Sequence, residues 1–257
     1  MEFLRPRKEW EISHNAKIKT YPDYYIISIC SASCYRDAGL ELSGWSDEKT
    51  SSRRSAGGLR AKAESLRRAR QKIKDIALCT EFTHFVTLTL DKEKIDRYDY
   101  KEIVKKMRVF LSNAVERKGF CYLLVPEFHK DGAVHFHGLY RSERGMGEVG
   151  SGKRTKAGQE IFNLSSWKFG FSTSIPLQGN YERVVSYILK YIRKDSEKVG
   201  GRWYLSGGDI KRPDERLADL PYHAFDVDEF VVPDVNFKFK YLKIPREDFD
   251  EFCNQHF

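Results

Sequence analysis

Hydrophobic residues follow two different spacings in the central part of the chain. From Leu59 to Cys79 they recur three or four residues apart, which is the spacing of an amphipathic helix. From Phe85 to Leu90 they alternate with threonines, and this pattern indicates a β-strand. A second helix is predicted to run from a cap at Asp96 or Asp99 to about Lys118.

A β-hairpin is predicted next. The apolar run Cys121–Val125 and the run Val134–Tyr140, which is rich in β-formers, flank Asp131-Gly132, a strong signal for a turn between antiparallel strands. The order strand, helix, strand, strand is the first part of a split βαβ arrangement. We therefore expect an α+β fold, with a ferredoxin-like or RRM-like core around a central antiparallel sheet.

Further elements are predicted on both sides of this core. Trp167–Ile175 has the pattern of another strand, Asn180 opens a helix that is expected to reach about Lys194, and Arg202–Leu205 should form a short strand. The terminal parts of the chain each carry one predicted strand, at Tyr24–Cys30 and at Asn236–Leu242.

Composition indicates where the domain boundaries lie. Residues 43–58 are rich in Ser, Gly and charged residues with almost nothing to bury, which predicts an exposed linker or loop. Beyond Pro213 the chain becomes more acidic. We therefore divide it into an N-terminal extension with a linker (1–58), a central domain (59–213) and a C-terminal extension (214–257).

The segment Arg141–Ala157 is rich in Gly, Ser and Arg and is predicted to be a mobile basic loop over the site. Gly147 to Arg154 comes close to a nucleotide-binding P-loop. Arg154, however, stands where that motif needs a Ser or Thr to contact magnesium, and neither the preceding strand nor the following helix is evident. We therefore reject nucleotide binding.

Two histidines and a glutamate form the first candidate site. In a strand, alternate residues point to the same face, so His135 and His137 project side by side, and Glu127 ends the partner strand of the hairpin next to them. Two imidazoles on one face make half a metal site, with the carboxylate as a third ligand. The alternative is a pair of polar residues on a solvated face. His129 competes for a ligand role, although its place in the turn favours a solvated loop histidine.

Two tyrosines form the second candidate site. Tyr187 and Tyr191 lie four residues apart in the predicted helix and share a face, each with a lysine three positions on, Lys190 and Lys194. Tyrosine is a weak nucleophile at its ordinary pKa of about 10, and a nearby ammonium group can stabilise the phenolate. Taken alone, Tyr187 can also be a half-buried packing residue.

The charge balance suits a polyanionic partner. Lys and Arg number 45 against 37 Asp and Glu, which gives a net charge of +8. Nine of these cations lie between Arg53 and Lys74, where Glu64 is the single acid. A phosphate-contacting helix face and an ordinary solvated face both fit this pattern. The DNA-binding candidates are Arg67, Arg68, Arg70, Lys72 and Lys74.

A cytoplasmic location without membrane attachment is expected. The chain contains no run of about 18 apolar residues, and its N-terminus lacks the apolar core of a signal peptide. Five scattered cysteines do not make a disulfide framework.

Taken together, Phe85–Leu90, then Glu127 with His135 and His137, then Tyr187 to Lys194 resemble the three ordered motifs of the HUH endonucleases. The likeness is in particular to the replication initiators of rolling-circle plasmids and small single-stranded DNA phages, and it covers about residues 59–213. The resemblance implies the HUH endonuclease fold, a divalent metal (Mg²⁺ or Mn²⁺) held by the two histidines and Glu127, and Tyr191 and Tyr187 as nucleophiles.

The activity implied by this resemblance is nicking and joining of single-stranded or stem-loop origin DNA through a 5′-phosphotyrosine. A host helicase and polymerase would be partners, because no helicase-type phosphate loop is evident. A single-strand DNA transposase or a relaxase would use the same chemistry. A rival of another class is a non-enzymatic RRM-like RNA-binding module, although the aromatic RNP pattern of such modules is absent.

Overall fold

The computed structural model describes residues 13–36, 56–129, 131–192, 196–231 and 237–256. The chain divides into two compact units. The central unit is Ser52–Arg212, and the terminal unit combines Met1–Ser51 with Pro213–Phe257.

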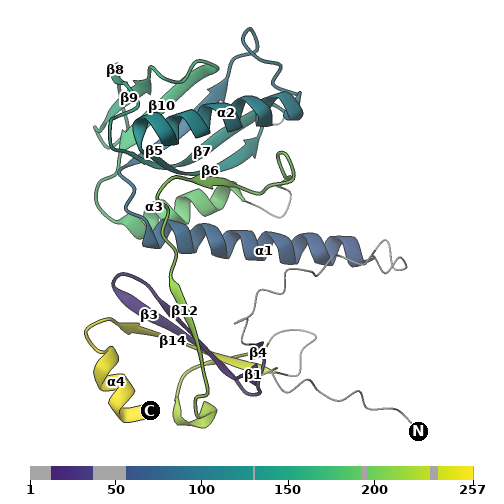
Figure 1. Ribbon diagram of the computed structural model, residues 1–257, viewed down its shortest axis with the longest axis vertical. Coiled ribbons are helices and arrows are strands. Elements are labelled where there is room, and N and C mark those ends of the chain that lie inside the picture. The colour runs from purple at the N-terminus through teal and green to yellow at the C-terminus, as the bar shows by residue number, and fades with distance from the viewer. Residues whose placement is uncertain (1–12, 37–55, 130, 193–195, 232–236, 257) are drawn as a thin grey trace. The chain divides into compact units, whose positions relative to one another are not determined.

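The central unit is built on a seven-stranded sheet with the order β11-β6-β7-β5-β10-β9-β8 (Figure 1). All of its paired strands are antiparallel. The strands are β5 (His84–Leu90), β6 (Phe120–Phe128), β7 (Val134–Ser142), β8 (Glu148–Arg154), β9 (Glu160–Leu164), β10 (Gly170–Pro176) and β11 (Leu205–Gly207). The expected α+β class is therefore confirmed.

The first part of the sheet has the predicted order of elements. β5 and β6 both pair antiparallel with β7, which lies between them, so β5 and β6 run parallel and are joined by α2 (Tyr100–Lys118). This is a split βαβ unit. After β7, the hairpin β8–β9 follows where a ferredoxin-like fold has its second helix.

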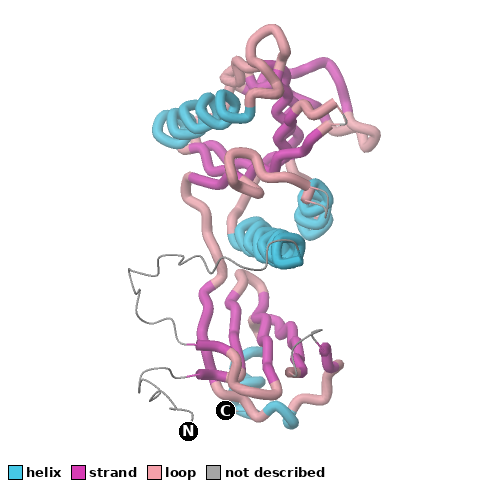
Figure 2. The backbone as a smooth tube through the Cα atoms, turned by 90° about the vertical axis from the view of Figure 1, so that its right-hand side faces the viewer, coloured by secondary structure: helices cyan, strands magenta, loops and turns pink. Residues whose placement is uncertain are grey.

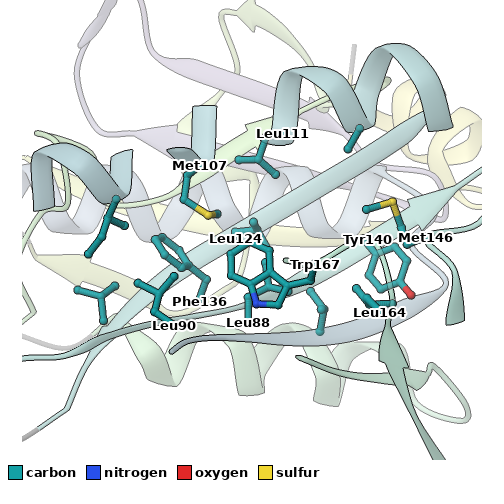
Figure 3. Close-up of a cluster of buried hydrophobic side chains, with 14 of the residues drawn as sticks. Leu88, Leu90, Met107, Leu111, Leu124, Phe136, Tyr140, Met146, Leu164 and Trp167 are labelled. Carbon is teal, nitrogen blue, oxygen red and sulfur yellow. The ribbon is translucent and has the colours of Figure 1, made fainter. Parts of the chain in front are cut away.

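Helix α2 has the predicted ends. The Asp99 side chain accepts hydrogen bonds from the backbone N–H groups of Lys101 and Glu102, and Gly119 ends the helix in the left-handed conformation with φ of 57°. Its buried residues pack on one face of the sheet, where they join side chains of β5, β6 and β7 (Figure 3). The helix-side members of this cluster are Ile103, Met107, Leu111 and Ala114.

The opposite face of the sheet is covered by α1 (Ala56–Cys79) and α3 (Tyr181–Ile188). Figure 2 shows α2 on one side of the sheet and these two helices on the other. Leu66, Ala69, Ile73 and Ile76 of the predicted stripe are buried, whereas Ala63 is exposed.

Three predictions for the central unit need correction. The helix expected to reach Lys194 ends at Ile188, a 3₁₀ turn follows at Leu189–Tyr191, and Ile192 is already extended. The expected basic loop at 141–157 contains strand β8, which pairs with β9. The short strand expected at Arg202–Leu205 lies instead at Leu205–Gly207.

The terminal unit joins the two predicted extensions in one sheet. Its five strands have the order β12-β2-β3-β14-β13, and a pair of two-residue strands, β1 and β4, lies apart from them. The Asn15 side chain bonds both the N–H and the C=O of Leu220, 205 residues further along the chain. The strands and helices are β1 (Ser13–His14), β2 (Ala16–Thr20), β3 (Tyr24–Cys30), β4 (Tyr35–Arg36), β12 (Asp214–Ala218), η2 (Tyr222–Ala224), β13 (Glu229–Val231), β14 (Lys238–Pro245) and α4 (Phe249–His256).

The strand predicted at Tyr24–Cys30 is confirmed as β3, and the strand predicted at Asn236–Leu242 corresponds to β14. Of the predicted linker, residues 43–55 lie outside the described residues and 56–58 belong to α1. None of the helices in the described part of the chain is long and apolar enough to span a membrane.

Candidate functional site

The β6–β7 hairpin brings the predicted glutamate and histidines together. Glu127 lies directly opposite His135, and His137 is two residues further along β7, so the three side chains share one face of the sheet. A glycine allows the two strands to approach at this point, because a Cβ on Gly138 would lie 2.1 Å from the backbone oxygen of Leu123.

The tip of the hairpin is fixed by local polar contacts. The Asp131 carboxylate accepts a hydrogen bond from the backbone N–H of Ala133 at 3.0 Å, and Gly132 adopts a positive φ of 87°. The hydroxyl of Tyr100, at the start of α2, donates to the carbonyl of Gly132 at 3.0 Å. These contacts set the end of the strand that carries His135.

Both histidines are oriented by threonines of the neighbouring strand β5. Thr87 lies opposite His137 in register, and their Oγ1 and Nδ1 atoms are 3.1 Å apart. Thr89 lies opposite His135 with the corresponding distance of 3.2 Å. Since each Nδ1 is engaged by a hydroxyl, each Nε2 is the nitrogen left for a ligand or a carboxylate.

In this structure Nε2 of His137 is hydrogen-bonded to Oε2 of Glu127 at 2.8 Å. A carboxylate only accepts, so Nε2 carries the proton in this arrangement and Nδ1 accepts from the Thr87 hydroxyl. If Nε2 instead bound a metal, Nδ1 would carry the proton and donate to the same hydroxyl. A threonine at position 87 therefore fits both states of the imidazole.

Both imidazoles are held in the neutral form. Burial lowers the pKa of His135 to about 4, with His129 and His137 adding to the shift. Burial also lowers the pKa of His137, while the Glu127 carboxylate opposes that shift. Neutral imidazole is the form that binds a metal ion, so neither histidine needs to lose a charge first.

The donor set suits a divalent metal, although the side chains are not gathered around one point. Two imidazole nitrogens and a carboxylate are ligands that Mn²⁺ accepts, and Mg²⁺ prefers the oxygen. Among the described residues, no group of three or more His, Cys, Asp or Glu side chains is arranged to hold a metal. The Glu127–His137 hydrogen bond accounts for this, because it directs the carboxylate at the nitrogen that would be a ligand.

His129, the competing histidine, is exposed at the hairpin tip as expected for a loop residue. Its ring nevertheless stacks on that of His135, with 3.8 Å between the ring centroids.

The second motif meets the first at His137. The ring of Tyr191 stacks on the His137 imidazole with a centroid distance of 3.9 Å and an interplanar angle of 6°. The Tyr191 hydroxyl donates to the hydroxyl of Tyr187 at 2.7 Å. Spacing alone predicts that the two phenol oxygens share one place, and this is confirmed even though Tyr191 lies in a 3₁₀ turn rather than in the α-helix.

The two tyrosines have different surroundings. Tyr191 lines a cavity of about 360 Å³ together with Glu127 and Lys190, whereas the Tyr187 side chain is 46% exposed and its ring packs against Phe85. Burial, followed by the hydrogen bond to Tyr187, raises the pKa of Tyr191 well above its ordinary value. Tyr191 is therefore a neutral phenol in this structure.

Of the two predicted lysines, Lys190 is exposed and its Nζ lies 5.8 Å from the centroid of the Tyr187 ring, within cation–π range. Lys194 lies outside the described residues.

The predicted cations of α1, at positions 67, 68, 70, 72 and 74, are all exposed, but they differ in their contacts. Arg67, Arg70 and Lys74 line a groove of about 970 Å³ between α1 and the turn that holds Lys190. Arg68 instead forms an ion pair with Glu64 at 2.6 Å. Lys72 is not among the residues that line this groove.

Arg70 has a structural task in addition to any contact with DNA. Its Nη1 donates to the carbonyl oxygen of Leu189 at 2.7 Å and also to that of Ile192. The arginine thus binds carbonyls on both sides of Tyr191, at the place where the helix ends and such groups lack partners within the helix.

Sequence reasoning identified Phe85–Leu90 as a strand and missed the contribution of Thr87 and Thr89 to the site. The available signal was their alternation with apolar residues, which places both hydroxyls on one strand face. Assigning each threonine to a histidine also requires the β5–β7 register, which the sequence does not state.

A comparison with protein families agrees with the location of this site. Residues 83–196 match the model of a family of replication-associated proteins of the ORF2 type. No curated protein and no solved structure matches the chain significantly. The family match covers less than half of the chain, but it contains both threonines, the glutamate, the two histidines and the two tyrosines. It associates this segment with replication and is consistent with a rolling-circle initiator.

Proposed function

We propose that the chain initiates and ends rolling-circle replication by nicking and rejoining single-stranded DNA, and that its central unit is an HUH endonuclease domain. The observation that carries this proposal is the stacking of Tyr191 on His137. It puts a phenol beside the histidine pair, inside the segment that matches a replication-associated family.

Tyr191 is the proposed nucleophile. Its Oη attacks the scissile phosphorus, the bond from phosphorus to O3′ breaks, and a 5′-phosphotyrosine and a free 3′-OH result. The phenol proton must leave during the attack, and the Tyr187 hydroxyl, 2.7 Å away, is its first acceptor. The new ester conserves the bond energy, so the DNA can be rejoined without ATP.

His135, His137 and Glu127 would hold the metal, Mg²⁺ or Mn²⁺. When bound there, a divalent metal withdraws charge from the scissile phosphate and orients it. Thr87 and Thr89 keep the two imidazoles directed toward it. Tyr187 would serve the closing step, because its oxygen lies next to that of Tyr191 and can attack a phosphate at the same place.

The partners that follow from this function are single-stranded or stem-loop origin DNA, a host helicase and a polymerase. A transposase or a relaxase would use the same residues. The family match supports replication over these alternatives.

The experiment is to incubate the protein and Mn²⁺ with single-stranded oligonucleotides that tile the DNA flanking its gene. We expect one of them to yield a protein–DNA adduct that survives denaturing electrophoresis, together with a fragment whose 3′ end a polymerase can extend. Cleavage without an adduct, or no cleavage of any tiled strand by folded protein, would refute the proposal.

A further inference from the structure

One half of the site-bearing sheet face is open. Side chains of β10 that point to this face lie beside those of β5: Phe171 is opposite Thr89, and Thr173 is opposite Thr87. Their neighbours Ser172 and Ser174 point the other way and are buried. Phe171 is therefore on the same face as the histidines, two strands from His135, a distance of about 10 Å.

The same face continues across the β8–β9 hairpin. Ser174, on the α2 face, pairs with Phe162, so Asn163 of β9 points to the site face. Val149 is opposite Asn163, and after a register shift Lys153 is opposite Ile161. The open strip, defined as Phe171, Thr173, Asn163, Val149 and Lys153, crosses β10, β9 and β8.

Every member of the open strip is exposed, and for two apolar members the exposure is large. Phe171 is 70% exposed and Val149 is 56% exposed. The apolar cluster beneath α1 and α3 draws on β5, β6 and β7, and within the described residues it includes no side chain from β8, β9 or β10. An apolar strip left uncovered beside a candidate active site marks a binding surface.

We propose that the open strip binds the DNA strand on one side of the scissile phosphate, with a base stacked on Phe171. This inference rests on the proposed function and adds the path of the substrate. An exposed ring accepts any base, because every base has a π-face, and Lys153 supplies a cation for the phosphate backbone. Continuity with the histidine pair through Thr89 favours this occupant, since Thr89 contacts His135 and lies beside Phe171.

The test is the affinity of the full chain for a fluorescent oligothymidylate, measured by anisotropy without metal in a Tyr191→Phe background, so that no covalent adduct forms. Phe171→Leu keeps an apolar side chain and removes the ring. We expect it to weaken binding about 5- to 100-fold, the range for loss of one stacked base. Phe171→Trp should bind within about twofold of the parent.

Matched controls separate stacking from general damage. Val109, 57% exposed on α2, is an exposed apolar residue outside the strip, and Val109→Ala should bind like the parent. Lys153→Gln should reduce the slope of log affinity against log salt by about 0.7, the value for one phosphate contact on a single strand. Thermal melting of each variant shows whether it is folded.

Failure of this inference and failure of the proposed function give different results. If the unmutated chain forms the covalent adduct while Phe171→Leu binds oligothymidylate as tightly as Val109→Ala does, the open strip is not the binding surface. If Phe171→Leu weakens binding while no tiled strand is ever cleaved, the open strip is upheld and the nicking function is refuted.

Discussion

The two faces of the seven-stranded sheet use the same strands for different tasks. Under α2 the face is almost entirely apolar, and Leu88, Leu124 and Phe136 pack against Met107 (Figure 3). The opposite face is apolar only where α1 and α3 cover it, and it becomes polar at the histidines. Since neighbouring residues of a strand point to opposite faces, stability and chemistry should respond separately to adjacent substitutions.

The largest effect is expected from the contrast within residues 135–137. Phe136 is 1% exposed, and Phe136→Ala should lower the free energy of unfolding by about 3–5 kcal/mol. The double variant His135→Ala, His137→Ala should stay folded and lose metal binding and detectable DNA cleavage. Urea unfolding and calorimetric metal titration measure the two quantities. Undiminished metal binding and cleavage by the double variant would remove the basis for the metal assignment.

The next effect concerns the hydroxyl behind His137. Thr87→Val keeps the shape of the side chain but removes the hydrogen bond to Nδ1, so metal affinity and cleavage rate should fall about 10- to 100-fold. Thr87→Ser restores a hydroxyl and should recover most of the loss. Equal activity of the valine and serine variants would show that Thr87 serves packing alone.

A smaller effect is expected at the cations along α1. Arg67 and Lys74 line the groove, while Arg68 and Lys72 do not. Changing the first pair to Gln should flatten the salt dependence of single-strand binding by about 1.4, or about 0.7 for each phosphate contact. The same change in the second pair is the matched control and should have less effect. An identical slope for both double variants would mean that the groove does not guide the strand.

The smallest effect concerns the polar group in the α2 face. Burial opposes ionisation of Glu148, yet hydrogen bonds from the Met146 N–H and the Tyr140 hydroxyl lower the pKa of its carboxyl. This stabilisation is present above the unfolded pKa of about 4.3 and is lost as the pH falls through the lower folded value. Between pH 5 and pH 3 the parent should therefore lose more stability than Glu148→Gln does. Parallel losses in thermal melts would contradict this expectation.

Local signals in the sequence were sufficient for the elements that form the site. The Asp131-Gly132 turn, the cap at Asp99 and the alternation at Phe85–Leu90 are read within a few residues, and each corresponds to an element of the structure. Such signals act over one turn or one strand, so composition and periodicity show them.

The predictions that failed depend on distant partners or on misleading composition. Ile188 to Ile192 continues an apolar helical pattern without Gly or Pro, so the sequence gives no sign that the helix stops where Arg70 binds the carbonyls. Gly and Ser residues in β8 suggested a loop, yet the strand forms because β9 pairs with it. The sheet of the terminal unit joins segments about 200 residues apart, and no local pattern announces such a pairing.

The central claim is that Tyr191, stacked on His137, becomes linked to DNA. The most direct measurement is mass spectrometry of the covalent adduct after digestion with trypsin and nuclease, with the modified tyrosine located in the peptide by fragmentation. We predict a nucleotide on Tyr191 after the first cleavage and none on Tyr187, and an adduct that is absent from Tyr191→Phe and retained by Tyr187→Phe. A nucleotide found on Tyr187 alone would reverse the two roles, and an adduct on another residue, or one that persists in the Tyr187→Phe, Tyr191→Phe double variant, would contradict the account.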